Sequence, residues 1–504
     1  MPNLSQSPFP NRNAWIGLAI FVALLHLIGL GNHGLLEPDE GRYANMAAEW
    51  TEFDEHDWKE PVLSDVGHYD KPPLIYWLTG SSFLAFGRSE FSARLPSLFG
   101  GFLTLAGVVL IAGRLHGARA AWWSVLVTAT TFQFWALTHL LSPDMLLCGL
   151  VTLGTGCALQ ATPGKRHGWL WWIAGALFWS LGWWTKATAA LVPLGALTLA
   201  LLITRRWDLL ARLRPVRLFL LILLLGSPWY LLMVSKHHEL WDFFFHRELA
   251  GRVTGHADGR RGFPGFHFAV ALGFWLPWWP VLISPARRHW QTWRSASWAE
   301  KCRSLPWEVV AALGVIAIFS LVSSKLVTYI LPGLPYLAIA VGSVIARTDA
   351  VFSFRQWPAR IAGIATLSLI ATALVMPGIE HSLSRNSSVR LPIAKAQELD
   401  ARWLICDEFW PGAEFYFGEF VWFVDVKNLM QVESTRGQVP AKHFLSKNQV
   451  EPLVNASDGP AVWLLQYRGH FQNPQKWARK LIATRPDPDS EPIQVGDFYL
   501  WRVR

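Results

Sequence analysis

Hydrophobic residues gather in runs of about 17 to 21 that recur from the first residues to about residue 377. A helix needs roughly 20 apolar residues to cross a hydrocarbon core about 30 Å thick. The pattern therefore predicts an α-helical polytopic membrane protein with about 11 to 13 transmembrane helices. The predicted spans are 14–30, 92–113, 118–137, 141–160, 168–183, 186–204, 216–234, 266–284, 307–322, 326–346 and 359–377.

Polar and charged residues orient these spans. The 504 residues are 52% hydrophobic and 16% charged, with a net charge of +9. The basic residues gather in alternate loops, which the positive-inside rule places in the cytoplasm. They form no aromatic-lined soluble face, so we expect no nucleic acid partner. Residues 1–13 have no small-residue cleavage site, so the first helix is predicted to be a retained anchor.

This orientation places 31–91, 235–265 and 378–504 outside the cytoplasm. After Pro377 the hydropathy falls, and 378–504 is predicted to be a small α/β domain. Its predicted strands are 401–406, 420–424, 461–466 and 497–503, with a helix at 473–484. The domains expected are therefore 1–377, which spans the membrane and carries the loops 31–91 and 235–265, and 378–504.

The first outside loop carries the densest polar motif, Glu37-Pro-Asp-Glu-Gly-Arg-Tyr43. Asp39 and Glu40 could simply begin a helix, as a cap and as a complement to its dipole. Asp144 lies at another outside helix entrance and would add a carboxylate to the same surface. Two acids at one interface indicate general-base work, binding of a substrate hydroxyl, or metal binding.

Lys71 follows in Tyr69-Asp-Lys-Pro-Pro73, where two prolines stiffen the chain. A lone interfacial Lys usually extends its charged end to the membrane surface. Because Lys71 lies beside an acidic cluster, it instead indicates a phosphate-binding site.

The second outside loop combines arginines with glycines and His256. Its residues could form a solvated loop, or a lid whose guanidinium groups bind an anionic lipid. Further along, Lys325 is predicted to anchor a helix at the interface, and Tyr329 to border a lipid groove. The four cysteines show no disulfide or metal spacing, and we find no nucleotide-binding signature.

Four motifs in this order resemble those of the polyprenyl-phosphate-dependent GT-C glycosyltransferases. They are Glu37–Tyr43, Asp70-Lys-Pro-Pro73, Ser92-Ala-Arg-Leu-Pro96 and Ser324–Pro332. The resemblance covers about residues 15–380 and is greatest to the lipid A aminoarabinose transferases and protein mannosyltransferase-like enzymes. Gly41 within the acidic motif and the Lys-Pro-Pro form depart from the aminoarabinose group.

The resemblance implies an inverting transferase of the inner membrane that acts on its periplasmic side. It implies a sugar donor carried on undecaprenyl phosphate. The implied acceptor is lipid A or another envelope glycan or protein. We expect a monomer in contact with membrane lipids. Catalysis would involve Asp39, Asp144 and Glu40. Donor binding would involve Lys71, Arg42, Tyr43, Arg247, Arg252, Arg260 and Tyr329. Asp70 and His256 resemble a pair that holds a divalent metal, zinc or magnesium.

A transporter or flippase for a lipid-linked substrate is the alternative. Such a protein should place its ionisable residues within broken spans near the midplane of the membrane. The candidate residues instead gather at one boundary, which favours the transferase.

Overall fold

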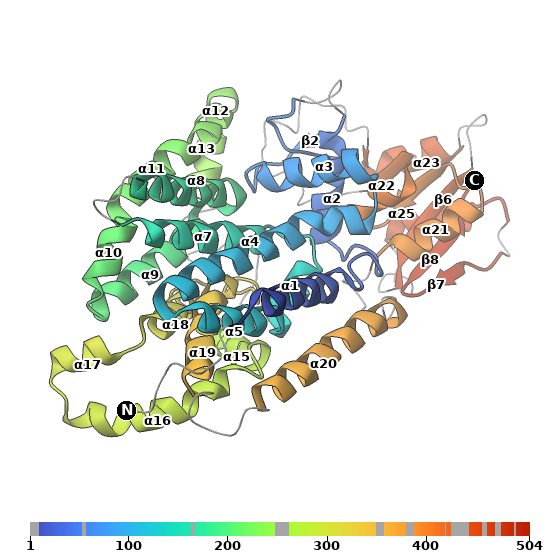
Figure 1. Cartoon of the computed structure of the whole chain (residues 1–504). Coiled ribbons are helices and arrows are strands. Elements are labelled where there is room, and N and C mark those ends of the chain that lie inside the picture. The colour runs from blue at the N-terminus through green and yellow to red at the C-terminus, as the bar shows by residue number, and fades with distance from the viewer. Residues whose placement is uncertain are drawn as a thin grey trace. The chain divides into compact units, whose positions relative to one another are not determined.

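The computed structural model describes residues 10–52, 57–162, 167–246, 262–348, 357–379, 388–418, 420–424, 443–455, 461–468, 475–487 and 490–504. The chain divides into two compact units. We call 1–29 with 96–373 the helical unit, and 30–95 with 374–504 the sheet unit. Figure 1 shows their elements, and each unit is described by itself.

The helical unit is built from helices that enclose one large apolar core. Its α-helices are α1 (Arg12–Leu27), most of α4 (Glu90–His116), α5 (Ala118–Ala129), α6 (Phe132–Thr138), α7 (Pro143–Gln160), α8 (Gly168–Lys186), α9 (Leu191–Ile203), α10 (Trp207–Leu213), α11 (Pro215–Gly226), α12 (Pro228–Lys236), α13 (Leu240–Asp242), α15 (Phe266–Phe274), α16 (Ile283–Ser295), α17 (Trp298–Ser304), α18 (Trp307–Leu321), α19 (Leu334–Thr348) and α20 (Trp357–Ile379). Short 3-10 turns are η2 (Ala187–Ala190), η4 (Trp279–Leu282) and η5 (Leu331–Gly333).

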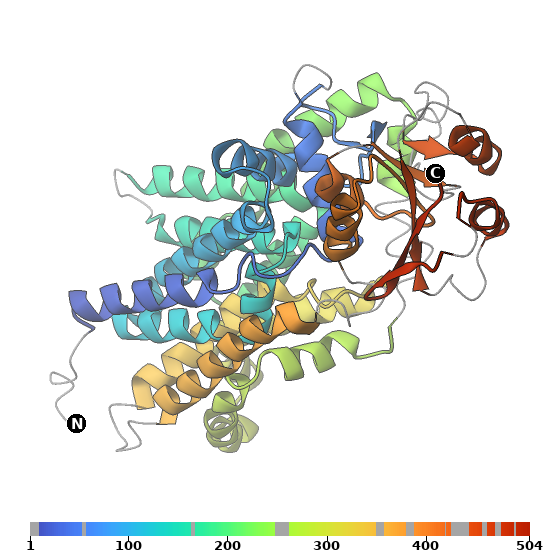
Figure 2. The same cartoon turned by 90° about the vertical axis from the view of Figure 1, so that its right-hand side faces the viewer.

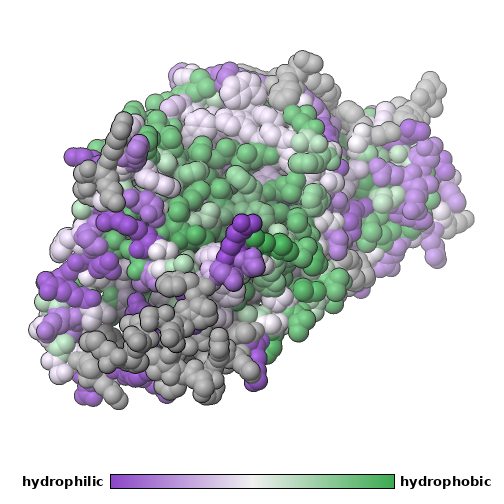
Figure 3. Space-filling view, viewed as in Figure 1, coloured by the Kyte–Doolittle hydropathy of each residue, from purple (hydrophilic) through white to green (hydrophobic). Residues whose placement is uncertain are grey.

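Several of these helices have the length and composition of membrane spans. Three stretches qualify in the described part of the chain, at Glu90–His116, Gly168–Ile203 and Trp207–Lys236, and six qualify if each of three bent helix pairs is one span. In Figure 3 a broad hydrophobic surface covers the helices of this unit, and hydrophilic residues gather at the edge where α10 and α17 lie. The higher count of spans stays a prediction.

The predicted span 118–137 is interrupted where α5 ends and α6 begins. The hydroxyls of Thr130 and Thr131 donate to the carbonyls of Leu126 and Val127, each at 2.7 Å. Such local bonds compete with the helical hydrogen-bond pattern and bend the chain. Hydropathy alone does not reveal this break, because both threonines are buried in an otherwise apolar run.

Glycine allows α4 and α7 to approach closely. A Cβ on Gly107 of α4 would lie 2.6 Å from the backbone nitrogen of Leu153 in α7. A Cβ on Gly100 would lie 2.6 Å from Cα of Leu146. Small residues in this spacing let membrane helices pack backbone to backbone.

The sheet unit contains a six-stranded mixed sheet in the order β5-β4-β3-β6-β8-β7. The strands are β3 (Trp403–Cys406), β4 (Phe420–Val424), β5 (Phe444–Leu445), β6 (Val462–Tyr467), β7 (Ile493–Val495) and β8 (Phe498–Arg502). β3 pairs in parallel with β4 and β6, whereas β8 is antiparallel to both β6 and β7.

Helices cover both faces of this sheet. Alternate residues of β3 point to opposite faces, so Leu404 and Ile405 belong to different apolar clusters. One cluster includes α21 (Arg390–Glu398) and α22 (Gly412–Phe417), and the other α23 (Lys447–Asn455) and α25 (Lys476–Ala483). Figure 2 shows the orange pair and the dark red pair on opposite sides of the strands.

The first outside loop belongs to the same unit. It folds into α2 (Asp39–Trp50), the short hairpin of β1 (Val62–Leu63) and β2 (Val66–Gly67), and α3 (Leu74–Phe86). The structure thus joins this loop to residues 374–504 in one compact unit, a grouping that hydropathy does not predict.

Candidate functional site

The acidic motif Glu37–Tyr43 contains three carboxylates, those of Glu37, Asp39 and Glu40, and they differ in burial and in their partners. Asp39 is the first residue of α2, and its helix is preceded by Pro38 without a side-chain cap. Half of the Asp39 side chain is exposed, and its Oδ1 accepts a bond of 2.6 Å from Arg42 Nη2. Asp39 therefore does not cap the helix, and its carboxylate stays accessible beside a guanidinium group.

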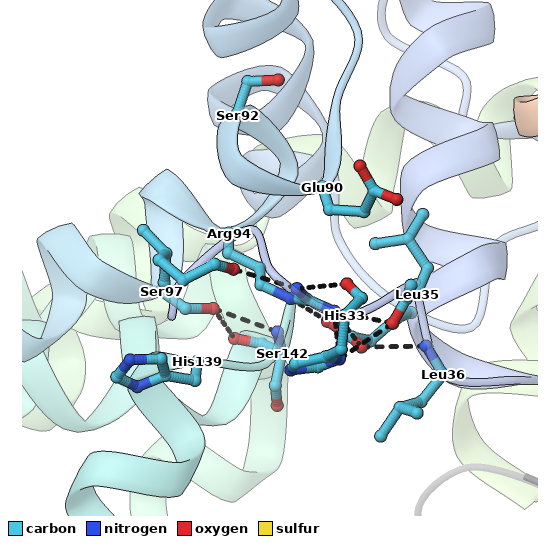
Figure 4. Close-up of polar contacts among 12 residues, drawn as sticks. His33, Leu35, Leu36, Glu90, Ser92, Arg94, Ser97, His139 and Ser142 are labelled. Carbon is cyan, nitrogen blue, oxygen red and sulfur yellow. Dashed lines mark hydrogen bonds and ion pairs between the residues drawn. The ribbon is translucent and has the colours of Figure 1, made fainter. Parts of the chain in front are cut away.

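Glu40 is committed to a buried ion pair. Arg94 has no exposed surface, and its Nε and Nη2 each lie 3.0 Å from an oxygen of Glu40. Arg94 also donates to the carbonyls of Leu30, His33 and Gly34 at 2.9 to 3.0 Å. Figure 4 shows this cluster of bonds around Arg94. The pair holds the loop before α2 in place, so the geometry favours a structural role for Glu40.

Glu37 is also buried. Its Oε1 accepts a bond of 2.9 Å from the Gly412 nitrogen, while Oε2 has no hydrogen-bond partner within the described residues. Burial raises the pKa of Glu37 to about 8, only partly opposed by the Gly412 bond. The acidic motif therefore contains one accessible carboxylate, Asp39, and two that are shielded from solvent.

The Asp70-Lys71 turn is a second charged group of the same unit. Lys71 Nζ lies 3.0 Å from Asp70 Oδ2 and donates to the Asp70 carbonyl at 3.0 Å. His68 Nε2 lies 3.2 Å from the other carboxylate oxygen of Asp70. Burial disfavours the Asp70 carboxylate, but Lys71, His68 and Arg42 outweigh it and hold its pKa well below the usual range.

The two groups meet around Arg42 and Tyr43. The Arg42 guanidinium lies 5.2 Å from the centre of the Tyr43 ring. The carboxylates of Asp70 and Asp39 both favour the charged form of Arg42. Burial raises the pKa of Tyr43 to about 12, while Arg42 and Lys71 favour its charged form. Asp39, Arg42, Tyr43, Asp70 and Lys71 therefore form one cluster, which we call the first-loop cluster.

Asp144 lies in the helical unit, near the N-terminus of α7. Its backbone nitrogen donates to the Ser142 hydroxyl at 3.1 Å, and its Oδ1 lies 2.6 Å from Lys186 Nζ. Lys186 also lies 4.8 Å from the centre of the Tyr329 ring. The structure thus joins the predicted residues Asp144 and Tyr329 through Lys186, which the sequence reasoning missed. An ionisable residue within the apolar stretch 168–204 was the available signal.

Lys325, by contrast, lies at the end of α18. Its Nζ donates to the carbonyls of Ser320 at 2.6 Å and Val322 at 2.5 Å. A cation on the last carbonyls of a helix complements the helix dipole. The anchoring of Lys325 at the membrane interface stays a prediction.

The described residues offer a limited set of metal ligands. They contain no group of three or more His, Cys, Asp or Glu side chains suited to a metal ion. Asp70 Oδ2 is held by Lys71, whereas Oδ1 lies 3.2 Å from His68 Nε2 and neither of these two atoms forms a hydrogen bond among the described residues. The predicted partner His256 lies outside the described residues, as do Arg247, Arg252 and Arg260. The predicted pairing of Asp70 and His256 therefore stays a prediction.

Known proteins resemble the chain in sequence and in fold. Residues 70–231 match the family model of dolichyl-phosphate-mannose-protein mannosyltransferases. An undecaprenyl phosphate-alpha-4-amino-4-deoxy-L-arabinose arabinosyl transferase of Pectobacterium carotovorum is 28% identical over 72% of this chain and 64% of its own length. One from Pseudomonas fluorescens is 30% identical over 65% of this chain and 59% of its own length. The chain thus spans less than two thirds of the length of these curated relatives.

The fold agrees with this relationship. The crystal structure of ArnT from Cupriavidus metallidurans bound to undecaprenyl phosphate matches with a TM-score of 0.76 at 18% identity, over 97% of this chain and 98% of that one. The chain is thus an integral membrane protein with the GT-C fold. In sequence the chain is similar to these aminoarabinose transferases, and in fold it is similar to ArnT.

Proposed function

We propose that the chain is an inverting glycosyltransferase that moves a sugar from a polyprenyl-phosphate donor to a lipid or glycan acceptor. The observation that carries this proposal is the first-loop cluster, where an accessible carboxylate, Asp39, lies in the same charged group as Lys71 and Arg42. The arrangement supplies both a base and phosphate-binding cations. The relatives named as arabinosyl transferases, and the neighbour that holds undecaprenyl phosphate, support the same donor class.

The proposed chemistry separates these roles. Lys71 and Arg42 stabilise the negative charge that grows on the phosphate as the bond to the sugar breaks. Asp39 accepts the proton of the acceptor hydroxyl as that oxygen attacks the anomeric carbon from the opposite side. Lys71 is then shared between Asp70 and the donor phosphate, so Asp70 holds the cation in position before the donor arrives.

Asp144 has a supporting part in this proposal. Its contact with Lys186 makes it a partner of a buried cation, and the Tyr329 ring lies 4.8 Å from the same cation. We propose that the three residues form a polar border for the lipid phosphate. The predicted contacts of Arg247, Arg252 and Arg260 belong to the same proposal.

A divalent metal, zinc or magnesium, would be held by Asp70 and His256, where it would supply a further positive charge for the leaving phosphate. Asp70 Oδ1, which is buried and forms no hydrogen bond among the described residues, would be the oxygen that contacts this metal, whereas Oδ2 is held by Lys71. No step above depends on this metal, and no nucleotide cofactor is needed.

The proposal also concerns the location of the protein. We propose a monomer with about 11 to 13 spans in the inner membrane. Its membrane domain is residues 1–377, and residues 378–504 form an α/β domain in the periplasm. The active site then faces the periplasm, opposite the Arg-rich loops.

The test uses the purified protein in lipid vesicles with a panel of polyprenyl-phosphate sugars and with lipid A as acceptor. Mass spectrometry should find a glycosylated acceptor together with released polyprenyl phosphate. Movement of an intact donor across the bilayer, without cleavage of the sugar, would instead identify a flippase and overturn the proposal.

A further inference from the structure

A second site lies at the opposite end of the helical unit from Asp144 and Tyr329. It is a pocket of about 710 Å³ between α16, α17, α18 and the C-terminal end of α19. At 1.5 Å per residue, α19 carries the chain about 20 Å from its start near Tyr329 to this end. Within the helical unit, the pocket is therefore separate from Asp144 and Tyr329.

Basic side chains line this pocket. Arg303 and Arg347 are exposed, and neither forms an ion pair with a carboxylate in the described part of the chain. The nearest acid in sequence to Arg303, Glu300, accepts bonds from the nitrogen and hydroxyl of Ser297 at 2.9 and 2.6 Å. A third lining arginine, Arg206, is paired with Asp208 at 3.2 Å. Besides the bonds from Ser297, Arg303 also favours the charged form of Glu300 and so lowers its pKa, but no salt bridge joins the two residues. The guanidinium groups of Arg303 and Arg347 can therefore both contact an anion.

Arg347 also contacts His116, which in turn contacts Glu308. His116 Nε2 lies 2.6 Å from Glu308, and Arg347 Nη2 lies 3.5 Å from His116 Nδ1. Glu308 is 4% exposed, whereas the Arg347 side chain is exposed to solvent.

Aromatic rings form the apolar part of the same pocket. Trp290 and Trp293 of α16 stack with their ring centres 5.2 Å apart. Trp307 at the start of α18 is 2% exposed, and its indole nitrogen has no hydrogen-bond partner among the described residues. The pocket therefore combines cations with an apolar wall.

The helices around the pocket have the character of a membrane interface. Trp290 and Trp298 are 56% and 74% exposed, although both belong to short helices rich in basic residues. Exposed tryptophans beside arginines are typical of the headgroup level of a bilayer. A soluble anion would need the arginines alone, whereas a lipid would also use the tryptophan wall.

We propose that this pocket binds an anionic glycerophospholipid. Its phosphate contacts Arg303 and Arg347, and its glycerol and upper acyl chains pack on Trp290 and Trp293. Bidentate guanidinium contacts suit phosphate, and basic pockets at the ends of membrane helices hold anionic headgroups. In the orientation proposed above, this end faces the cytoplasmic leaflet.

Native mass spectrometry of the full-length protein in detergent tests this site. The probes are a short-chain phosphatidylglycerol, the matching phosphatidylcholine and glycerol 1-phosphate. The wild-type protein should bind phosphatidylglycerol saturably and in preference to the other two. Arg303→Ala with Arg347→Ala should weaken this binding about 30-fold, since each cation near a membrane surface contributes about 1 kcal/mol.

The matched control is Arg288→Ala with Arg294→Ala, which removes the same charge from α16 without touching a residue that lines the pocket. This pair should change the affinity less than about threefold if the pocket, rather than the overall charge, binds the lipid. Equal losses in both pairs would overturn the site. Equal affinity for glycerol 1-phosphate would identify a soluble anion instead of a lipid. Because the readout is lipid binding, either outcome leaves the proposed transfer reaction independently testable.

Discussion

Asp39 and Glu40 are adjacent acids for which the structure predicts opposite consequences of the same chemical change. Asp39→Asn and Glu40→Gln each remove one negative charge and keep the shape of the side chain. Glu40 lies 3% exposed with both oxygens on Arg94, whereas half of the Asp39 side chain is exposed. Stability and transfer activity should therefore respond separately to the two substitutions.

The magnitudes follow from these contacts. Glu40→Gln replaces one acceptor oxygen by an amide that faces a guanidinium donor, and it leaves the charge of fully buried Arg94 unpaired. Loss of one partner from a buried ion pair costs about 3–5 kcal/mol. Asp39→Asn removes only a half-exposed pair with Arg42, which contributes about 0–1 kcal/mol. The same substitution, Asp39→Asn, should lower the rate of sugar transfer by a factor of about 10² or more, the scale of a lost general base.

Thermal unfolding in detergent and a transfer assay at saturating donor measure the two effects on the same samples. The Glu40→Gln protein should unfold at a clearly lower temperature or fail to accumulate. The Asp39→Asn protein should unfold like the wild type and bind the lipid donor, yet lose transfer. Normal turnover by Asp39→Asn would refute the base assignment. A stable, inactive Glu40→Gln protein would move that assignment to Glu40.

Three further predictions concern other parts of the chain. Lys71→Ala should weaken use of the donor far more than Lys325→Ala in a donor titration, because Lys325 donates to carbonyls at the end of α18. Equal, mild losses would remove Lys71 from the site. Gly107→Ala should lower the unfolding free energy by about 1–3 kcal/mol, because the new Cβ would clash with the α7 backbone. Gly195→Ala should not lower it, because the space around Gly195 is open. Urea titrations that rank the two variants the other way would contradict the contact between α4 and α7. Glu37 has a pKa of about 8 in the folded protein, against an ordinary value of 4.5. Its contribution to the free energy of unfolding is therefore fully present below pH 4.5 and is lost as the pH rises to about 8. Glu37→Gln, but not the exposed Glu398→Gln, should therefore reduce the fall in stability over this range, and parallel pH profiles for the wild type and Glu37→Gln would show that Glu37 ionises normally.

Much of the secondary structure could be predicted from local patterns. Four predicted β-type runs coincide with β3, β4, β6 and β8, because buried strands are short, β-branched or aromatic runs. The short strands β5 and β7 have no such signal, and only pairing with their neighbours defines them. The break between α5 and α6 depends likewise on two threonine hydroxyls inside an apolar run.

The candidate site divides in the same way. The sequence by itself determined that acids, Lys71 and two prolines recur on one excursion from the membrane, since motif density and hydropathy are local properties. Only the tertiary structure decided which acid is accessible to a substrate. Arg94, 54 residues after Glu40, forms a buried ion pair with the Glu40 carboxylate. Asp39 stays half exposed beside Arg42. Only the fold brings Lys186 to Asp144, 42 residues earlier in the chain. Ion pairs of this kind depend on distances in space, which the spacing of residues along a chain does not specify.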